Sequence, residues 1–413
     1  MKNLKGACMF AQSGGPTSVI NASAAGVFIE ALAQENITKV YGAAHGIKGI
    51  LTESFYDMGQ EDMAELELLK YTPSSALGSV RYKLKDASVD DTDYKRILEV
   101  FKKYDIRYFF YNGGNDSMDT CNKISKFMLE HNYECRVMGI PKTIDNDLAG
   151  TDHCPGYASA AKYIATSLME IYHDARVYDK GMITVVEIMG RNAGWLTAAA
   201  ALAGHKGLGA DLIYLPEVAF DIDTFVEDVK KVCAKNNGKC IAVVSEGIRD
   251  KDGKLIVELV GSVGRDSFGH AQLGGVAATL ANLLKEKTGY KTRGIELSLM
   301  QRCGAHLASK VDVEETFGAG RAAVKAAVNG ETDKMVCYER QEGSEYKCEY
   351  KLLPLELAAN TEKTVPQEWI INNGTYVSDE FVKYALPLIQ GDCKAPLEDG
   401  LPRFAKLKKV LVK

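Results

Sequence analysis

One local pattern recurs along the sequence: a short apolar strand, then a glycine-containing or polar turn, then an amphipathic helix. We predict strands at residues 6–11, 106–111, 137–140, 182–188 and 240–245, and helices at residues 18–34, 94–104, 117–131 and 194–203. This alternation is typical of parallel sheets that are covered by helices. The chain is therefore predicted to be an α/β protein, and its 413 residues suffice for two or three domains.

The composition excludes several other classes of protein. Hydrophobic residues make up 46% and charged residues 25%, as in soluble globular proteins. A net charge of −5 argues against a nucleic-acid partner, and the absence of a long apolar run argues against a membrane span. Without a secretory signal, we expect a cytoplasmic protein whose ten scattered cysteines stay reduced. The seven histidines are also dispersed, which argues against a zinc site.

Glycine, polar and charged residues gather where the predicted strands end. In parallel sheets, ligands bind at the carboxyl ends of the strands. Residues of this kind directly follow predicted strands at five places: Gly14, Asn115, Asp145, Arg191 and Glu246. Their positions indicate an enzyme before any family is considered.

Two glycine-containing loops are candidate phosphate sites. Residues 13–18 (Ser-Gly-Gly-Pro-Thr-Ser) join a strand to a helix. Glycines let backbone N–H groups approach an anion there, and the helix N-terminus adds a favourable dipole. A plain tight turn is the alternative, and no Walker motif follows. Residues 113–117 (Gly-Gly-Asn-Asp-Ser) form the second loop, where Asp116 or Ser117 could instead simply cap the helix.

A third loop, residues 141–147 (Pro-Lys-Thr-Ile-Asp-Asn-Asp), directly follows a predicted buried strand. It brings Lys142 together with the two carboxylates of Asp145 and Asp147. Two carboxylates at the end of a strand suit general base catalysis or metal binding, whereas a solvated polar turn is the plain alternative.

Together these loops resemble the phosphofructokinase family over residues 6–329. The Thr-Ile-Asp-Asn-Asp string at residues 143–147 carries most of the resemblance. It is supported by Leu-Gly-Ser-Val-Arg at 77–81, Val-Val-Glu-Ile-Met-Gly-Arg at 185–191, Ser-Glu-Gly at 245–247 and Gln-Arg at 301–302. The resemblance implies two doubly wound, three-layer (αβα) domains with the active site in the cleft between them.

The resemblance also implies how the chain divides. Residues 1–157 and 301–352 would form the phosphate-donor domain, and residues 158–300 the fructose 6-phosphate domain. Residues 353–413 look like a C-terminal extension, which we expect to pack on the second domain. In the family, one arginine reaches in from a neighbouring subunit, so a homodimer or homotetramer is implied.

Residue roles follow from the same resemblance. Asp145 would take the proton from the sugar 1-hydroxyl, and Thr143 would contact the transferred phosphoryl group. Gly14 would line the donor phosphates, and Arg81 would neutralise their charge. The residues that would hold fructose 6-phosphate are Thr143, Asp145, Met189, Gly190, Arg191, Glu246, Arg293 and Arg302.

Two positions favour pyrophosphate over ATP as the donor. Where the ATP-using branch has glycines, this chain has Asp116 and Lys142, as in the pyrophosphate-using branch. The Asp116 carboxylate would stand where the α-phosphate of ATP must lie. Two unit charges about 4 Å apart, at an effective dielectric constant of about 20, repel by roughly 4 kcal/mol, on the order of a thousandfold in affinity. Lys142 would supply positive charge to the phosphoryl oxygens.

Three positions depart from the family pattern. An aspartate linked to the metal is Asn115 here, so Mg²⁺ would be held by Asn115 and Asp147 and largely by pyrophosphate itself. An arginine that crosses the subunit interface falls at Met182, with Lys180 nearby as a possible substitute. A residue that contacts the 6-phosphate falls at Leu299.

The sequence thus predicts Mg²⁺-dependent, reversible phosphoryl transfer from pyrophosphate to the 1-hydroxyl of fructose 6-phosphate, a glycolytic reaction. An ATP-dependent enzyme of the same family is the first alternative. A non-catalytic sugar-phosphate-binding subunit is the second alternative. Such a protein should have lost the base and its neighbours, whereas this chain keeps Asp145, Asp147, Lys142 and Arg191. No nucleic-acid or membrane partner is expected.

Overall fold

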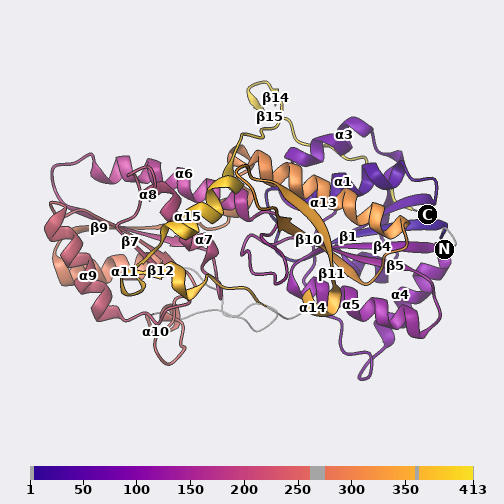
Figure 1. Cartoon of the computed structure of the whole chain (residues 1–413), viewed down its shortest axis with the longest axis horizontal. Coiled ribbons are helices and arrows are strands. Elements are labelled where there is room, and N and C mark those ends of the chain that lie inside the picture. The colour runs from indigo at the N-terminus through magenta and orange to yellow at the C-terminus, as the bar shows by residue number, and fades with distance from the viewer. Residues whose placement is uncertain (1–3, 261–274, 359–361, 413) are drawn as a thin grey trace.

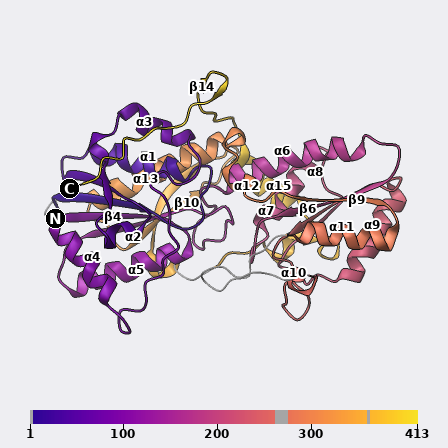
Figure 2. The same cartoon turned by 180° about the vertical axis from the view of Figure 1, so that it is seen from behind.

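The computed structural model describes residues 4–260, 275–358 and 362–412. It consists of two α/β domains, which lie side by side along the long axis of the molecule (Figure 1). Seen from behind, the same two lobes are joined by several crossing segments (Figure 2). Both ends of the chain lie at the outer edge of the first domain (Figure 1).

The first domain is built on a seven-stranded sheet in the order β11-β10-β5-β4-β1-β2-β3. Neighbours from β10 to β2 are parallel, whereas β3 and β11 pair antiparallel at the two edges. The strands are β1 Gly6–Gln12, β2 Ile37–Ala43, β3 Phe55–Asp57, β4 Ile106–Gly113, β5 Arg136–Pro141, β10 Lys334–Arg340 and β11 Cys348–Pro354.

Helices cover both faces of this sheet. They are α1 Ile20–Leu32, α2 Ile47–Leu51, α3 Met63–Leu68, α4 Thr92–Lys103, α5 Asn115–Glu130, α13 Lys310–Val328 and α14 Leu355–Ala358. Alternate residues of β1 point to opposite faces. Cys8 and Phe10 pack with α1 and α13, whereas Ala7 and Met9 pack with α4 and α5.

The second domain contains a four-stranded, fully parallel sheet in the order β7-β8-β6-β9. Its strands are β6 Met182–Ile188, β7 Leu212–Tyr214, β8 Cys240–Ser245 and β9 Lys291–Glu296. The remaining helices are α6 Tyr157–Arg176, α7 Trp195–Ala198, α8 Ala200–Gly204, α9 Ile222–Lys235, α10 Ile256–Val260, α11 Val276–Thr288, α12 Met300–Cys303 and α15 Asp379–Ala385. Val185 packs toward α9 and α11, and Val186 toward α6 and α15, so this domain also has three layers.

The predicted α/β fold with two αβα domains is confirmed, and the differences are local. Helix α5 begins at Asn115, two residues before the predicted start, so Asn115 and Asp116 belong to its first turn. Residues 194–203 form two helices, α7 and α8, because the N–H of Ala199 also bonds to the carbonyl three residues earlier and tightens the turn. Edge strands β9 and β11 were not predicted, because their sequences are rich in polar residues and lack the apolar pattern of a buried strand.

The C-terminal extension, which we expected to pack on the second domain, contacts both domains. Phe381 and Leu388 do pack in the core of the second domain. Residues after about 403 instead return to the first domain, where the N–H of Asp57 donates to the carbonyl of Val410 (2.9 Å). Tyr56 also pairs with Leu411, so the tail covers the backbone groups that β3 would otherwise leave open at the sheet edge. Residues 359–361 and 413 lie outside the described part.

Two further expectations can be compared with the structure. All ten cysteines are free, as predicted. Within the described residues, no helix has both the length and the apolar character that a membrane crossing requires. Two short hairpins, β12 Ile370–Ile371 with β13 Tyr376–Val377 and β14 Leu397–Glu398 with β15 Leu401–Pro402, lie in the C-terminal extension.

The contact between α1 and α13 yields a testable prediction. A Cβ on Gly26 would lie 2.2 Å from the backbone carbonyl oxygen of Phe317, so the helices approach closely only because this residue is glycine. Although Ala is a better helix former than Gly, Gly26→Ala should lower the free energy of unfolding by about 1–3 kcal/mol or more. Gly114→Ala, whose φ is −90° and whose new Cβ would lie 3.6 Å from its nearest neighbour, the carbonyl oxygen of Lys142, is the control for chemical denaturation. Unchanged stability of Gly26→Ala would contradict the packing argument.

Candidate active site

The order of the strands brings the three predicted loops together. β5, β4 and β1 are neighbours in the first sheet and run parallel, so the loops that follow them leave the sheet side by side. The N–H of Lys142 donates to the carbonyl of Gly113 (3.0 Å), and the N–H of Ser13 donates to that of Asn112 (2.9 Å). The backbone itself therefore ties the loops to one another.

The first glycine loop lies directly over Lys142. Gly14 has a φ of +77°, which favours glycine, and its carbonyl accepts a hydrogen bond from the hydroxyl of Ser79 (2.6 Å). A Cβ on Gly14 would lie 3.1 Å from the Nζ of Lys142. The same Nζ donates to the carbonyl of Gly15 (2.6 Å). The loop thus places a buried cation under the backbone that we expect to bind phosphate.

Lys142 is only 4% exposed. Burial lowers the pKa of its ammonium group to about 8, although the carboxylates of Asp145 and Asp147 act in the opposite direction. Arg302 and Arg81 also lower this pKa, which shows that their positive charges lie near Lys142. Three basic side chains therefore lie near one another at the first glycine loop, as an anion-binding site requires.

The two carboxylates of the third loop have raised pKa values. Burial and the charge of Glu246 raise the pKa of Asp145 to about 6, against the effect of Lys142 and Arg191. Burial and Asp145 raise the pKa of Asp147 to about 7. A carboxylate with a raised pKa is a stronger base, so Asp145 is suited to accept a proton near neutral pH.

Asn146, between these two carboxylates, anchors the loop to the protein. It is fully buried and has a φ of +56°, a conformation that asparagine tolerates better than most residues. Its Oδ1 accepts from the N–H of Cys154 (2.8 Å), and its Nδ2 donates to the hydroxyl of Tyr384 (2.8 Å). The N–H of Thr143 donates to the carbonyl of Pro155 (3.2 Å). The loop conformation is thus held from behind.

Asn115 and Asp147 lie together, as the metal prediction requires. Asn115 begins α5, and its Nδ2 lies 3.4 Å from the Oδ2 of Asp147. The Oδ1 of Asn115 is buried and has no hydrogen-bond partner among the described residues. An unpaired amide oxygen beside a carboxylate matches the oxygen ligands that Mg²⁺ prefers. Asp116 follows in the first turn of α5, where its side chain is exposed.

The predicted sugar-phosphate residues follow neighbouring strands of the second sheet. The N–H of Met189 donates to the Oε1 of Gln301 (3.2 Å), and the N–H of Gly190 donates to the Oε1 of Glu246 (3.1 Å). Gly190 has a φ of +140°, and a Cβ there would lie 2.7 Å from the carbonyl oxygen of Ala193, so only glycine fits.

Side chains from both domains meet at this point. Glu246 raises the pKa of Asp145, whereas Arg191 lowers it. Arg302 lowers the pKa of both Lys142 and Glu246. The Nη1 of Arg302 lies 3.2 Å from where a Cβ on Gly15 would be. Arg302 is therefore placed between the glycine loop of the first domain and Glu246 of the second.

Other predicted positions lie apart from this group. Arg293 is exposed on edge strand β9 and forms an ion pair with Asp174 at the end of α6 (2.7 Å). Met182 is buried at the start of β6, whereas Lys180 is exposed. Both line a surface cavity of about 710 Å³ at the amino-terminal end of the second sheet, opposite to the site. Leu299 is 54% exposed and offers no group for phosphate.

The structure adds residues that the sequence did not indicate. Glu362 pairs with Leu148 through the backbone, and its carboxylate raises the pKa of Asp145 and Asp147. The next residue, Lys363, donates its N–H to the carbonyl of Asp147 (2.7 Å). The C-terminal extension thus contributes to the site. No local signal could have shown this, because about 215 residues separate the two segments.

Comparison with known proteins decides the family. Residues 7–328 match the family model described as phosphofructokinase. The chain belongs to the phosphofructokinase family. A relative from Halomonas elongata, named pyrophosphate--fructose 6-phosphate 1-phosphotransferase, is 44% identical over 408 residues, which cover 97% of this chain and 96% of the relative.

Solved structures of phosphofructokinases agree with this assignment. The pyrophosphate-dependent phosphofructokinase from Nitrosospira multiformis is 41% identical, with a TM-score of 0.88, and the match covers 98% of this chain and 97% of that one. The pyrophosphate-dependent phosphofructokinase from Marinobacter aquaeolei is 39% identical, with a TM-score of 0.89, and the match covers 99% and 98%. The phosphofructokinase fold thus extends over nearly the whole chain.

The lowered pKa of Lys142 predicts an effect on stability. The pKa of Lys142 is about 8 in the folded protein and about 10.4 in the unfolded chain. Burying the ammonium group therefore lowers the free energy of unfolding fully below pH 8, and this loss becomes smaller as the pH rises towards 10. Lys142→Met should therefore be more stable than the wild type at pH 7, by on the order of 1–3 kcal/mol, and the difference should narrow above pH 8.

Denaturant titrations between pH 6.5 and 9.5 measure this difference. Lys162→Met is the matched control, because Lys162 is paired with Asp392 (2.8 Å) near the surface. This control should gain no stability at pH 7. A Lys142→Met protein less stable than the wild type at every pH would show that the amine stabilises the fold.

Proposed function

We propose that this phosphofructokinase transfers a phosphoryl group reversibly from pyrophosphate to the 1-hydroxyl of fructose 6-phosphate, giving fructose 1,6-bisphosphate and phosphate. One observation carries the proposal: the buried ammonium of Lys142 lies 2.6 Å from the carbonyl of Gly15 in the first glycine loop (residues 13–18), and the charge of Asp145 acts on it. Full-length relatives that are named for the same reaction support it.

Each step of the transfer can be assigned to a group in the chain. The sugar 1-hydroxyl oxygen forms a bond to the phosphorus of pyrophosphate while the bond to the leaving phosphate breaks, and Asp145 accepts the hydroxyl proton. Lys142, Arg81 and Arg302 hold the phosphoryl oxygens by positive charge. In the reverse direction, protonated Asp145 returns the proton to the same oxygen.

The acceptor would be held by the loops of the second domain. The backbone of Met189 and Gly190 would line the sugar site, and Glu246 would bind sugar hydroxyls. The Glu246 pKa is raised by burial despite the N–H of Gly190 and the charge of Arg191. A hydrogen-bonded, half-buried acceptor of this kind discriminates between hydroxylated ligands. Arg191 adds positive charge to the same loop.

We assign Mg²⁺ to Asn115 and Asp147. The unpaired Oδ1 of Asn115 and the adjacent carboxylate supply oxygen ligands, and pyrophosphate would supply others. When bound, Mg²⁺ neutralises negative charge on the phosphate oxygens. With Asn115 in place of an aspartate, the protein alone should bind Mg²⁺ weakly.

We also propose a homo-oligomer in the cytoplasm. Arg293 lies exposed and apart from the site of its own chain, which fits a residue that serves a neighbouring subunit. Lys180 is similarly exposed beside the buried Met182 and can supply the positive charge that methionine lacks. Ten free thiols fit a reducing compartment.

Asp145→Asn tests the assignment of the base. The amide keeps the size and hydrogen-bonding oxygen of the carboxylate but cannot accept the proton, so kcat should fall by on the order of 10²–10⁴. The dissociation constant for fructose 6-phosphate, measured by calorimetry, should change little. A variant that keeps more than half of the wild-type kcat would show that another group takes the proton.

A panel of donors tests the function itself. With fructose 6-phosphate and Mg²⁺, we expect turnover with pyrophosphate and little with ATP or ADP. Asp116→Gly should permit weak use of ATP, because it removes the carboxylate that repels the α-phosphate, and should lower turnover with pyrophosphate. Lys142→Gly should damage pyrophosphate turnover without opening the site to ATP.

The double variant Asp116→Gly/Lys142→Gly should use ATP better than either single variant, because both side chains act on the charge of the donor phosphates. The measurement is kcat/KM for both donors in all four proteins. Wild-type preference for ATP would establish the ATP-dependent alternative, and no turnover with any donor would favour the non-catalytic one.

A further inference from the structure

A segment outside the predicted motifs lies directly behind the third loop, residues 141–147, which we call the catalytic loop because the proposed function places Asp145 there. Residues 151–156 supply the carbonyl of Pro155 to the N–H of Thr143, and the N–H of Cys154 to Asn146. In the middle of this segment is His153, which is 1% exposed. The position of His153 therefore affects the backbone of residues 151–156, and this backbone holds residues 143–147.

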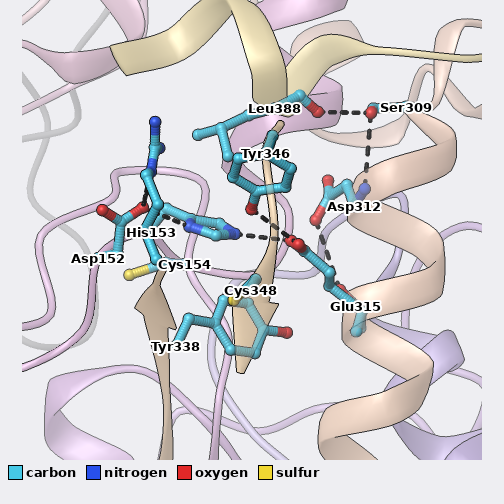
Figure 3. Close-up of polar contacts among 12 residues, drawn as sticks. Asp152, His153, Cys154, Ser309, Asp312, Glu315, Tyr338, Tyr346, Cys348 and Leu388 are labelled. Carbon is cyan, nitrogen blue, oxygen red and sulfur yellow. Dashed lines mark hydrogen bonds and ion pairs between the residues drawn. The ribbon is translucent and has the colours of Figure 1, made fainter. Parts of the chain in front are cut away.

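The ring of His153 is held between two carboxylates (Figure 3). Its Nδ1 lies 2.8 Å from the Oδ1 of Asp152, and its Nε2 lies 2.8 Å from the Oε2 of Glu315 on α13. A neutral imidazole has only one N–H, so it could donate to only one of them. Two ionised carboxylates at hydrogen-bond distance are satisfied together only by the doubly protonated imidazolium.

Neighbouring groups reinforce this arrangement. The Oδ1 of Asp152 also accepts from the guanidinium of Arg340 (3.0 Å), and the Oε1 of Glu315 accepts from the hydroxyl of Tyr346 (2.7 Å). The titratable and charged groups that face the ring are Asp152, Asp312, Glu315, Tyr338, Arg340, Tyr346 and Cys348. Burial lowers the pKa of His153, but the hydrogen bonds to both carboxylates outweigh it and raise the pKa above its ordinary value.

A bound metal ion is the alternative occupant. His153, Glu315 and Cys348 place one nitrogen, oxygen and sulfur atom within 4.8 Å of one another. However, two ligands of one tetrahedral zinc ion, each about 2.1 Å from it, lie about 3.3 Å or more apart. The 2.8 Å between Nε2 and Oε2 is a hydrogen-bond separation instead. Burial and Glu315 also raise the pKa of the Cys348 thiol to about 12, which disfavours the thiolate.

Tyr384 connects this cluster to the catalytic loop. Its hydroxyl donates to the carbonyl of Asp152 (2.8 Å) and accepts from the Nδ2 of Asn146 (2.8 Å). Its own backbone carbonyl accepts from Arg340 (3.0 Å). Tyr384 lies on α15, which packs in the core of the second domain through Phe381. The contacts thus join β10 and α13 of the first domain, the second domain and the loop.

We propose that the His153 imidazolium, held between Asp152 and Glu315, is a positioning group that fixes residues 151–156 and thereby the catalytic loop. It touches no reacting atom and acts through the Cys154–Asn146 and Asp152–Tyr384–Asn146 contacts. The proposal rests on the proposed function in that Asp145 and Asp147 of this loop do the chemistry.

His153→Gln is the direct test, because glutamine keeps a donor NH2 group at one end but loses the charge and has an acceptor oxygen in place of the second donor. We expect kcat with pyrophosphate and fructose 6-phosphate to fall about 10- to 100-fold, with KM within about threefold of wild type. Amide hydrogen exchange of peptides covering residues 143–156 should become at least tenfold faster. Tyr384→Phe leaves the imidazolium in place but removes the link, and should lower kcat about 3- to 10-fold.

Asp211→Asn is the matched control for destabilisation. Asp211 accepts from Arg176, Asn236 and the N–H of Ile241 in a half-buried network of the second domain. This variant should lower Tm without changing kcat or exchange in residues 143–156. A ¹⁵N-histidine spectrum at pH 7.5 should also show one imidazolium with two ring N–H groups, which His153→Gln removes.

Several results would overturn the proposal. These are a neutral His153 ring, unchanged exchange in residues 143–156, a kcat loss no larger than that of Asp211→Asn, or one equivalent of tightly bound zinc that Cys348→Ser abolishes. If His153→Gln fails to fold, Tyr384→Phe decides, since wild-type kcat in that protein excludes the link. If the wild type shows no turnover at all, the proposed function fails, but exchange and the spectrum still decide the positioning role.

Discussion

The burial of the Lys142 ammonium group is the constraint around which the site is arranged. Removing such a charge from water costs several kcal/mol unless it is paired and hydrogen-bonded. The carbonyl of Gly15 at 2.6 Å and the nearby carboxylates of Asp145 and Asp147 offset part of this cost. The lowered pKa of Lys142 shows that the compensation is incomplete. An anion such as pyrophosphate would complete it, so the site is preorganised for such a ligand.

The strand order explains why this charge can be placed there. β5, β4 and β1 are adjacent and parallel, so their loops share one edge, and β6 and β8 do the same in the second sheet. Arg302 and Glu246 lie near Lys142 and Asp145 only because the carboxyl ends of both sheets face the same region. Each domain alone would hold half of the site. The reaction therefore depends on how the domains are held together.

The C-terminal extension provides much of that connection. Lys363 contacts the backbone of Asp147, and Tyr384 contacts Asn146 and Asp152, while neighbouring residues pack in the second domain. The Nε1 of Trp195, in the second domain, donates to the carbonyl of Lys363 (2.8 Å). The His153 cluster lies where these contacts meet β10 and α13. A buried ionic cluster adds little stability by itself, but it tolerates few alternative arrangements, which suits a position behind a catalytic loop.

The sequence alone determined the α/β class, the three loops and the identity of Lys142, Asp145 and Asp147, because strand–turn–helix patterns and short motifs are local properties of the chain. It also singled out Gly14 and Gly190, and the structure gives both a positive φ, which favours glycine. Only the tertiary structure decided that Glu362 and Tyr384 reach the catalytic loop, that Arg293 lies apart from it, and that the tail returns to β3. These outcomes depend on contacts between segments separated by more than a hundred residues, and such contacts leave no periodicity or motif in the sequence.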